Sequence, residues 1–89
     1  MAEPVPADVL QAISHPLRLA LLVALERREQ SADDLAAALD VGPPALTHHL
    51  ALLRRAGLVH DGARPGDLRA AAGWAEIAEA LRRLQDGAG

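Results

Sequence analysis

The chain has 89 residues, 51% of them hydrophobic, and a formal net charge of −3 at pH 7. This length leaves no room for a second core, and we predict a single domain over residues 1–89. The chain contains no cysteine, which excludes a disulfide framework and a thiolate metal site. No apolar run approaches the roughly 18 residues of a membrane span, and the start is unlike a signal peptide. We therefore expect a soluble, cytoplasmic protein that does not enter membranes.

Residues 1–6 contain two prolines and are predicted to be extended, and residues 8–14 then form a short helix. The next helix starts at Ser14-His15-Pro16. Serine is a good cap, proline suits the first helical position, and His15 is assigned a local capping role. From residue 16 to about residue 28 the sequence is apolar almost all round, which is typical of a helix at the centre of a domain.

Residues 31–56 have the pattern of a helix-turn-helix. Ser31 is suited to cap a helix whose first turn holds two aspartates. A three-residue turn that ends in Gly42 leads to a second helix over residues 43–56. Three leucines of that helix recur at i, i+4 and i+7 and are predicted to face the core: Leu46, Leu50 and Leu53.

Gly57 is predicted to end this helix in the left-handed conformation. Two short strand-like pieces follow within residues 58–72, around a Gly- and Pro-containing loop that predicts a hairpin. The last helix is predicted over residues 74–86, with Glu79 and Arg83 spaced for an i, i+4 ion pair. The predicted fold is mainly α with a small β-hairpin, in the order helix, helix, helix, helix, strand, strand, helix.

The acidic chain has one basic stretch. Residues 41–72 hold four arginines against two carboxylates, and three of the four histidines lie there as well. A local positive field matters more than the total charge for a surface that meets a polyanion. This distribution indicates that nucleic acid is contacted by the second helix of the helix-turn-helix and by the hairpin.

Two segments carry a family resemblance. "SHPLRLALLVAL" and "SADDLAAALDVGPPALTHHLALLRRAGLV" resemble the ArsR-type winged helix-turn-helix transcriptional regulators, over roughly residues 12–72. The resemblance implies that residues 43–56 form a recognition helix in the major groove and that the hairpin forms a wing. It also implies a two-fold dimer built by the first and last helices, and repression of transcription. The residues assigned to DNA contact are Thr47, His48, His49, Arg54, Arg55, Arg64 and Arg69.

The sequence departs from this family at three places. The recognition helix opens with Pro43 and Pro44 instead of small polar residues, which removes two N–H donors and leaves base readout to Thr47 and His48. The Cys-x-Cys and the Asp/His ligands of the family's metal sensors are absent, so we expect no metal and no other cofactor. The wing carries a single arginine at its tip, flanked by Asp61 and Asp67.

Several residues keep two interpretations. His48 is either a DNA contact or a solvated side chain, and His49 is favoured as a structural hydrogen-bond partner over a base contact. Arg54 and Arg55 suit the negative end of the helix dipole as well as a phosphate. Because a small chain with one aromatic residue buries little surface, a homodimer is favoured. Its predicted interface is Val9, Leu10, Ile13, Trp74, Ile77, Leu81 and Leu84, although Trp74 could instead complete the core of one chain.

The predicted function is sequence-specific binding of double-stranded DNA by a dimeric transcriptional regulator. No Gly-rich phosphate loop, paired carboxylates or nucleophile with a positioned base occurs in the sequence, so an enzyme is not expected. The alternative is a winged helix that has lost DNA affinity and acts by pairing with another protein. The acidic total and the Pro-Pro-Ala first turn favour that alternative.

Overall fold

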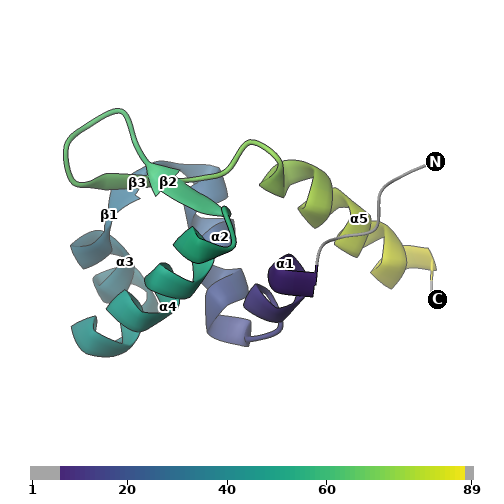
Figure 1. Cartoon of the computed structure of the whole chain (residues 1–89), viewed down its shortest axis with the longest axis horizontal. Coiled ribbons are helices and arrows are strands. Elements are labelled where there is room, and N and C mark those ends of the chain that lie inside the picture. The colour runs from purple at the N-terminus through teal and green to yellow at the C-terminus, as the bar shows by residue number, and fades with distance from the viewer. Residues whose placement is uncertain (1–6, 88–89) are drawn as a thin grey trace.

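The computed structural model describes residues 7–87, which form five helices and a three-stranded antiparallel sheet (Figure 1). The predicted extended start at residues 1–6 lies outside the described residues. The order of the elements confirms the mainly helical prediction and adds one strand. The elements are α1 (Ala7–Ala12), α2 (Pro16–Arg27), β1 (Gln30–Ser31), α3 (Ala32–Leu39), α4 (Pro43–Arg55), β2 (Val59–Asp61), β3 (Asp67–Ala70) and α5 (Trp74–Gly87).

Helix α2 lies at the centre, as its all-round apolar sequence predicts, and buries Leu21, Leu22 and Leu25. Its cap is His15, whose side chain accepts a hydrogen bond from the Leu17 N–H at 3.1 Å. The capping role predicted for His15 is therefore confirmed. The serine cap predicted at the same boundary is wrong, because the Ser14 hydroxyl donates to the Gln11 carbonyl, 2.7 Å away, and so closes α1 instead.

The sheet has the strand order β1-β3-β2, so β1 adds to the predicted hairpin at the far edge of β3. Gln30 pairs with Leu68 and Ser31 with Asp67. This strand was not predicted, because its two residues are too few to show an alternating pattern. Ser31 then serves a second purpose, since its hydroxyl accepts from the Asp34 N–H at 3.1 Å and starts α3, as predicted.

The helix-turn-helix has the predicted form. Helix α4 buries Leu46, Leu50 and Leu53, and Gly57 follows it with a φ of 75°. The turn before α4 contains a left-handed residue that was not predicted: Asp40 ends α3 with a φ of 54°. Aspartate tolerates this left-handed conformation better than most residues. The consequence is a tight corner that turns α4 against α3.

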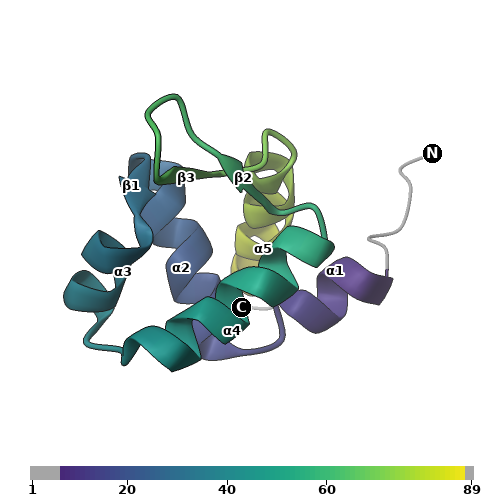
Figure 2. The ribbon, with the colours of Figure 1, turned by 60° about the vertical axis from the view of Figure 1, so that its left-hand side comes forward.

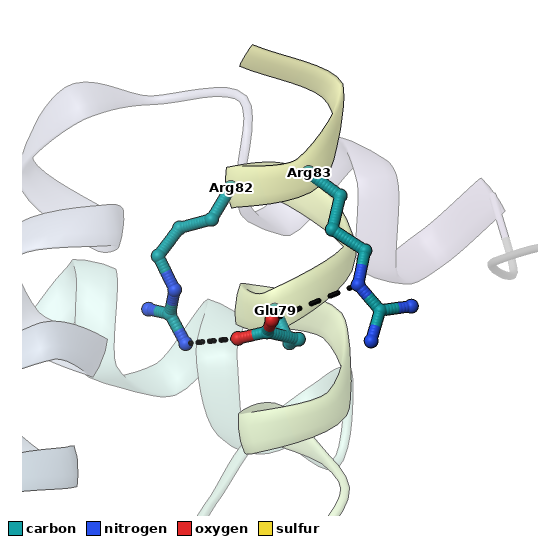
Figure 3. Close-up of polar contacts among 3 residues, drawn as sticks. All are labelled: Glu79, Arg82 and Arg83. Carbon is teal, nitrogen blue, oxygen red and sulfur yellow. Dashed lines mark hydrogen bonds and ion pairs between the residues drawn. The ribbon is translucent and has the colours of Figure 1, made fainter. Parts of the chain in front are cut away.

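Helix α5 lies at the opposite end of the molecule from α3 and the hairpin (Figure 1). Its first residue, Trp74, is 2% exposed and belongs to the main core. Further along, the Glu79 carboxylate pairs with Arg82 at 3.1 Å and with Arg83 at 3.6 Å (Figure 3). The second pair was predicted from the sequence. Within residues 7–87, no helix is long and apolar enough to cross a membrane.

Candidate nucleic-acid interface

The outer face of α4 carries the side chains that the sequence assigned to base readout. Thr47 and His48 are both exposed, while the leucine stripe of the same helix is buried. Helix α4 begins at Gly42 with no side-chain cap and with Pro43 and Pro44 in its first turn. The first polar side chain on the outer face is therefore Thr47. Figure 2 shows α4 at the front of the molecule, with the hairpin above it.

His49 is turned to the side of α4 and is half-buried. Its Nδ1 lies 3.1 Å from an Nη of Arg18 on α2, and its ring centroid lies 4.7 Å from that of His15. Burial lowers the pKa of His49, and so does repulsion from His15, Arg18 and His48. The structural hydrogen bond favoured for His49 is confirmed.

The two arginines at the end of α4 differ in their surroundings. Arg54 donates to the Asp61 carboxylate of β2 at 2.7 Å. This hydrogen bond and the Arg54 charge lower the pKa of the Asp61 carboxyl. Arg55 is exposed and makes no ion pair within the described residues. The charge of Arg54 is therefore partly compensated by a neighbouring carboxylate, whereas that of Arg55 is not.

The hairpin places Arg64 at its exposed tip and Arg69 on the exposed side of β3. Pro65 and Gly66, which has a φ of 85°, form the turn beside Arg64. One contact fixes the base of this loop: the Glu29 carboxylate accepts from the Ala63 N–H at 2.7 Å. Sequence reasoning missed Glu29, since 34 positions separate the two residues and neither has a motif around it.

Arg18 is a second residue that the sequence analysis did not single out. It lies within the "HPLR" segment that contributed to the family resemblance, but no role was assigned to it. The structure half-buries it between α1, α2 and α4. Within residues 7–87, no group of three or more His, Cys, Asp or Glu side chains could hold a metal ion.

The predicted dimer interface divides into two sets. Val9, Ile13 and Trp74 are 8%, 7% and 2% exposed and lie in the core of the single chain, so they have little surface left for a partner. This burial favours the alternative in which Trp74 completes one chain. The other set keeps surface: Leu10 and Leu84 are 51% and 70% exposed, and Ile77 and Leu81 are partly buried.

Comparison with known proteins places this geometry in a family. Residues 15–61, just over half of the chain, match the family described as bacterial regulatory proteins, arsR family. A protein of Agrobacterium fabrum named Biofilm growth-associated repressor is 42% identical over 53 residues, which are 60% of this chain and 45% of that protein. The chain thus spans less than half the length of this relative.

Two proteins of known structure extend the likeness beyond the matched segment. HlyU from Vibrio cholerae superposes with a TM-score of 0.71 at 31% identity, over 86% of this chain and 87% of that one. The transcriptional repressor BigR from Xylella fastidiosa superposes with a TM-score of 0.74 at 30% identity, over 88% of this chain and 83% of that one. These likenesses confirm the predicted winged helix-turn-helix fold.

Proposed function

Since the chain belongs to the arsR family of bacterial regulatory proteins, we propose that it binds double-stranded DNA and represses transcription, with α4 in the major groove. One observation carries the proposal: α4 hides its leucines and leaves Thr47 and His48 exposed on the opposite face. A helix presented in this way fits the major groove, where side chains read base edges. The names of the related repressors support the same activity for this chain.

Affinity comes from arginines on phosphates, and specificity comes from Thr47 and His48. The strongest phosphate candidates are Arg55, Arg64 and Arg69, because all three are exposed and none makes an ion pair within residues 7–87. Arg54 contributes less, since Asp61 already holds its guanidinium. With so few free cations, binding is modest and falls steeply as salt rises.

A homodimer places two copies of α4 in successive major grooves, about 34 Å apart on a pseudo-palindromic site. The apolar side chains that support this proposal are the ones that keep surface in one chain: Leu10, Ile77, Leu81 and Leu84. Leu84→Glu is expected to convert a dimer into a monomer in sedimentation. Ala75→Glu, an exposed position nine residues away on the same helix, is the control. A monomeric wild-type protein, or a dimeric Leu84→Glu variant, contradicts this interface.

The test of DNA binding begins with selection of bound fragments from genomic DNA, followed by titration of a selected duplex at rising salt. Arg55→Ala is expected to reduce the slope of log affinity against log salt by about 1 for each subunit of the dimer, and Arg54→Ala by less. The double variant Arg82→Ala/Arg83→Ala removes two exposed arginines from α5 and serves as the control. An unchanged slope in Arg55→Ala overturns the phosphate model.

A protein-interaction module remains the second candidate, favoured by the uncapped start of α4 and the compensated charge of Arg54. The result that would favour this candidate is a folded protein that selects no genomic fragment at low salt. In that outcome the outer face of α4 would be tested against other proteins instead of DNA.

A further inference from the structure

One arginine joins three helices. Arg18 leaves the first turn of α2, and its Nε donates to the carbonyl of Ala12. One Nη donates to the carbonyl of Gln11 at 3.3 Å, and the other lies 3.1 Å from Nδ1 of His49 on α4. Carbonyls in the last turn of a helix have no partner within that helix. Arg18 therefore links the end of α1 to the middle of α4.

This contact fixes the protonation state of His49. A guanidinium has only donors, so Nδ1 of His49 must be the acceptor and its proton must sit on the other ring nitrogen. A cationic imidazole carries a proton on both nitrogens and offers no lone pair to Arg18. The contact thus exists only while His49 is neutral.

The groups around His49 oppose its charged form. On α2 these are the Arg18 guanidinium and the His15 ring, whose Nδ1 is itself occupied as an acceptor for the Leu17 N–H. On α4 the neighbour is His48, at 5.5 Å between ring centroids. Burial and these same neighbours hold the pKa of His49 below its ordinary value.

Helix α1 and the end of α4 complete these surroundings. Helix α1 offers the two carbonyls that Arg18 already occupies, and its Asp8 lines the cleft next to Arg18, which Arg55 of α4 lines as well. No carboxylate lies within ion-pairing distance of Arg18 or His49 in the described residues. A proton on His49 would therefore meet a guanidinium across 3.1 Å without a counter-charge.

We propose that Arg18 is the positioning residue of the recognition helix, and that protonation of His49 breaks its contact with Arg18, loosens the position of α4 against α1 and α2, and so weakens specific DNA binding in mild acid. The part that concerns DNA rests on the function proposed above. The link between α1 and α4 does not, because it is a property of the folded chain. Helix α1 also carries Leu10 of the proposed dimer face. The same link therefore connects the dimer interface to the recognition helix α4.

The structural half is tested by NMR titration from about pH 7.5 to about pH 5.0, across the histidine range. The His49 imidazole and the backbone amides of Gln11 to Ile13 are expected to shift with one common midpoint. His49→Asn keeps an acceptor near the Nδ1 position and does not titrate, so the α1 amides should lose that response. His60→Asn removes an exposed imidazole from the hairpin and should leave it intact. Static α1 amides while His49 titrates would overturn the link.

The functional half uses the ratio of affinity for a selected duplex to affinity for a random duplex, because protonated surface histidines strengthen both. In the wild type this ratio should fall by about tenfold over the same pH range, the scale of one hydrogen bond to a charged group. In His49→Asn it should stay flat. Arg18→Lys keeps the positive charge but lacks the planar group with several N–H donors, so it should lower the ratio at about pH 7.5. A wild-type ratio that stays flat, or the same fall in His49→Asn, overturns this half. A protein that binds no DNA refutes the proposed function and leaves the NMR result standing.

Discussion

Trp74 is the largest fully buried side chain, and replacing it separates a core role from a role at a dimer seam. Trp74→Ala is expected to lower the free energy of unfolding by about 3–5 kcal/mol, the range for large-to-small changes of buried aromatics. A chain of 89 residues has a total of about 4–13 kcal/mol to lose. The variant should therefore lose a large share of the stability of the fold.

A second substitution at the same position separates the contribution of the indole N–H from that of the buried ring. The indole Nε1 of Trp74 is buried, and nothing within residues 7–87 accepts a hydrogen bond from it. An unpartnered buried donor costs about 1–3 kcal/mol, so Trp74→Phe recovers that amount while losing part of the ring. We expect a net loss below about 2 kcal/mol. Val23→Ala, at a side chain 44% exposed and outside the proposed dimer face, should stay within about 0.5 kcal/mol.

The assay is urea unfolding followed by far-ultraviolet circular dichroism, because the substitution removes the only aromatic fluorophore. It is repeated over about a tenfold range of protein concentration, since the stability of a dimer depends on concentration and that of a monomer core does not. The loss in Trp74→Ala should be the same at each concentration. A loss under about 1 kcal/mol, or one that vanishes at the highest concentration, would refute the placement of Trp74 in the core of one chain.

Two further predictions concern the hairpin and its neighbour α4. A Cβ on Gly62 would lie 2.5 Å from a carboxylate oxygen of Glu29, so in Gly62→Ala this exposed side chain should move away from the Ala63 N–H and release the loop, at a cost of about 0.5–1.5 kcal/mol for the lost hydrogen bond. Hydrogen exchange of the loop amides checks this, and Gly73→Ala, whose Cβ meets nothing within 4 Å, should leave them protected. The pKa of Asp61 is lowered by Arg54, so their ion pair adds stability above the ordinary aspartate value of about 4 and loses it as pH falls through the lowered value. Asp61→Asn should remove this acid-limb change, seen in unfolding curves from about pH 5 to about pH 2. If the variant still loses the same stability as the pH falls over this range, the loss belongs to another carboxyl group.

Local pattern predicted the parts of the fold that depend on neighbours in sequence. The spacing of Leu46, Leu50 and Leu53 determines which face of α4 is hidden, and Ser31 needs only the N–H three residues on to start α3. Both are effects of helix periodicity and capping, which act within one or two turns. The boundary at His15 shows the limit of this reasoning. Ser14 and His15 are adjacent and both could cap α2. Only the backbone path determines that Ser14 bonds back to α1 and that His15 forms the cap.

Contacts between distant residues could not be predicted in the same way. The Glu29 carboxylate meets the Ala63 N–H, and Arg18 meets His49 across 31 positions, without any repeating pattern to mark either pair. The exposed face of α4 was predicted from the spacing of its residues, but the different surroundings of Arg54 and Arg55 were not. That difference depends on Asp61 of β2, which pairs with Arg54 alone.

The start of α4 also matters before the chain is folded. Gly42 has a φ of −62° and a ψ of 140°, the extended form that a residue preceding proline already prefers in an unfolded chain. The rings of Pro43 and Pro44 fix two more φ angles near their helical value. Because fewer conformations are lost at this corner, its ordering carries a smaller entropic penalty, on the scale of about 0.4–1 kcal/mol for each proline. The bend between α3 and α4 is thus partly set in the denatured ensemble.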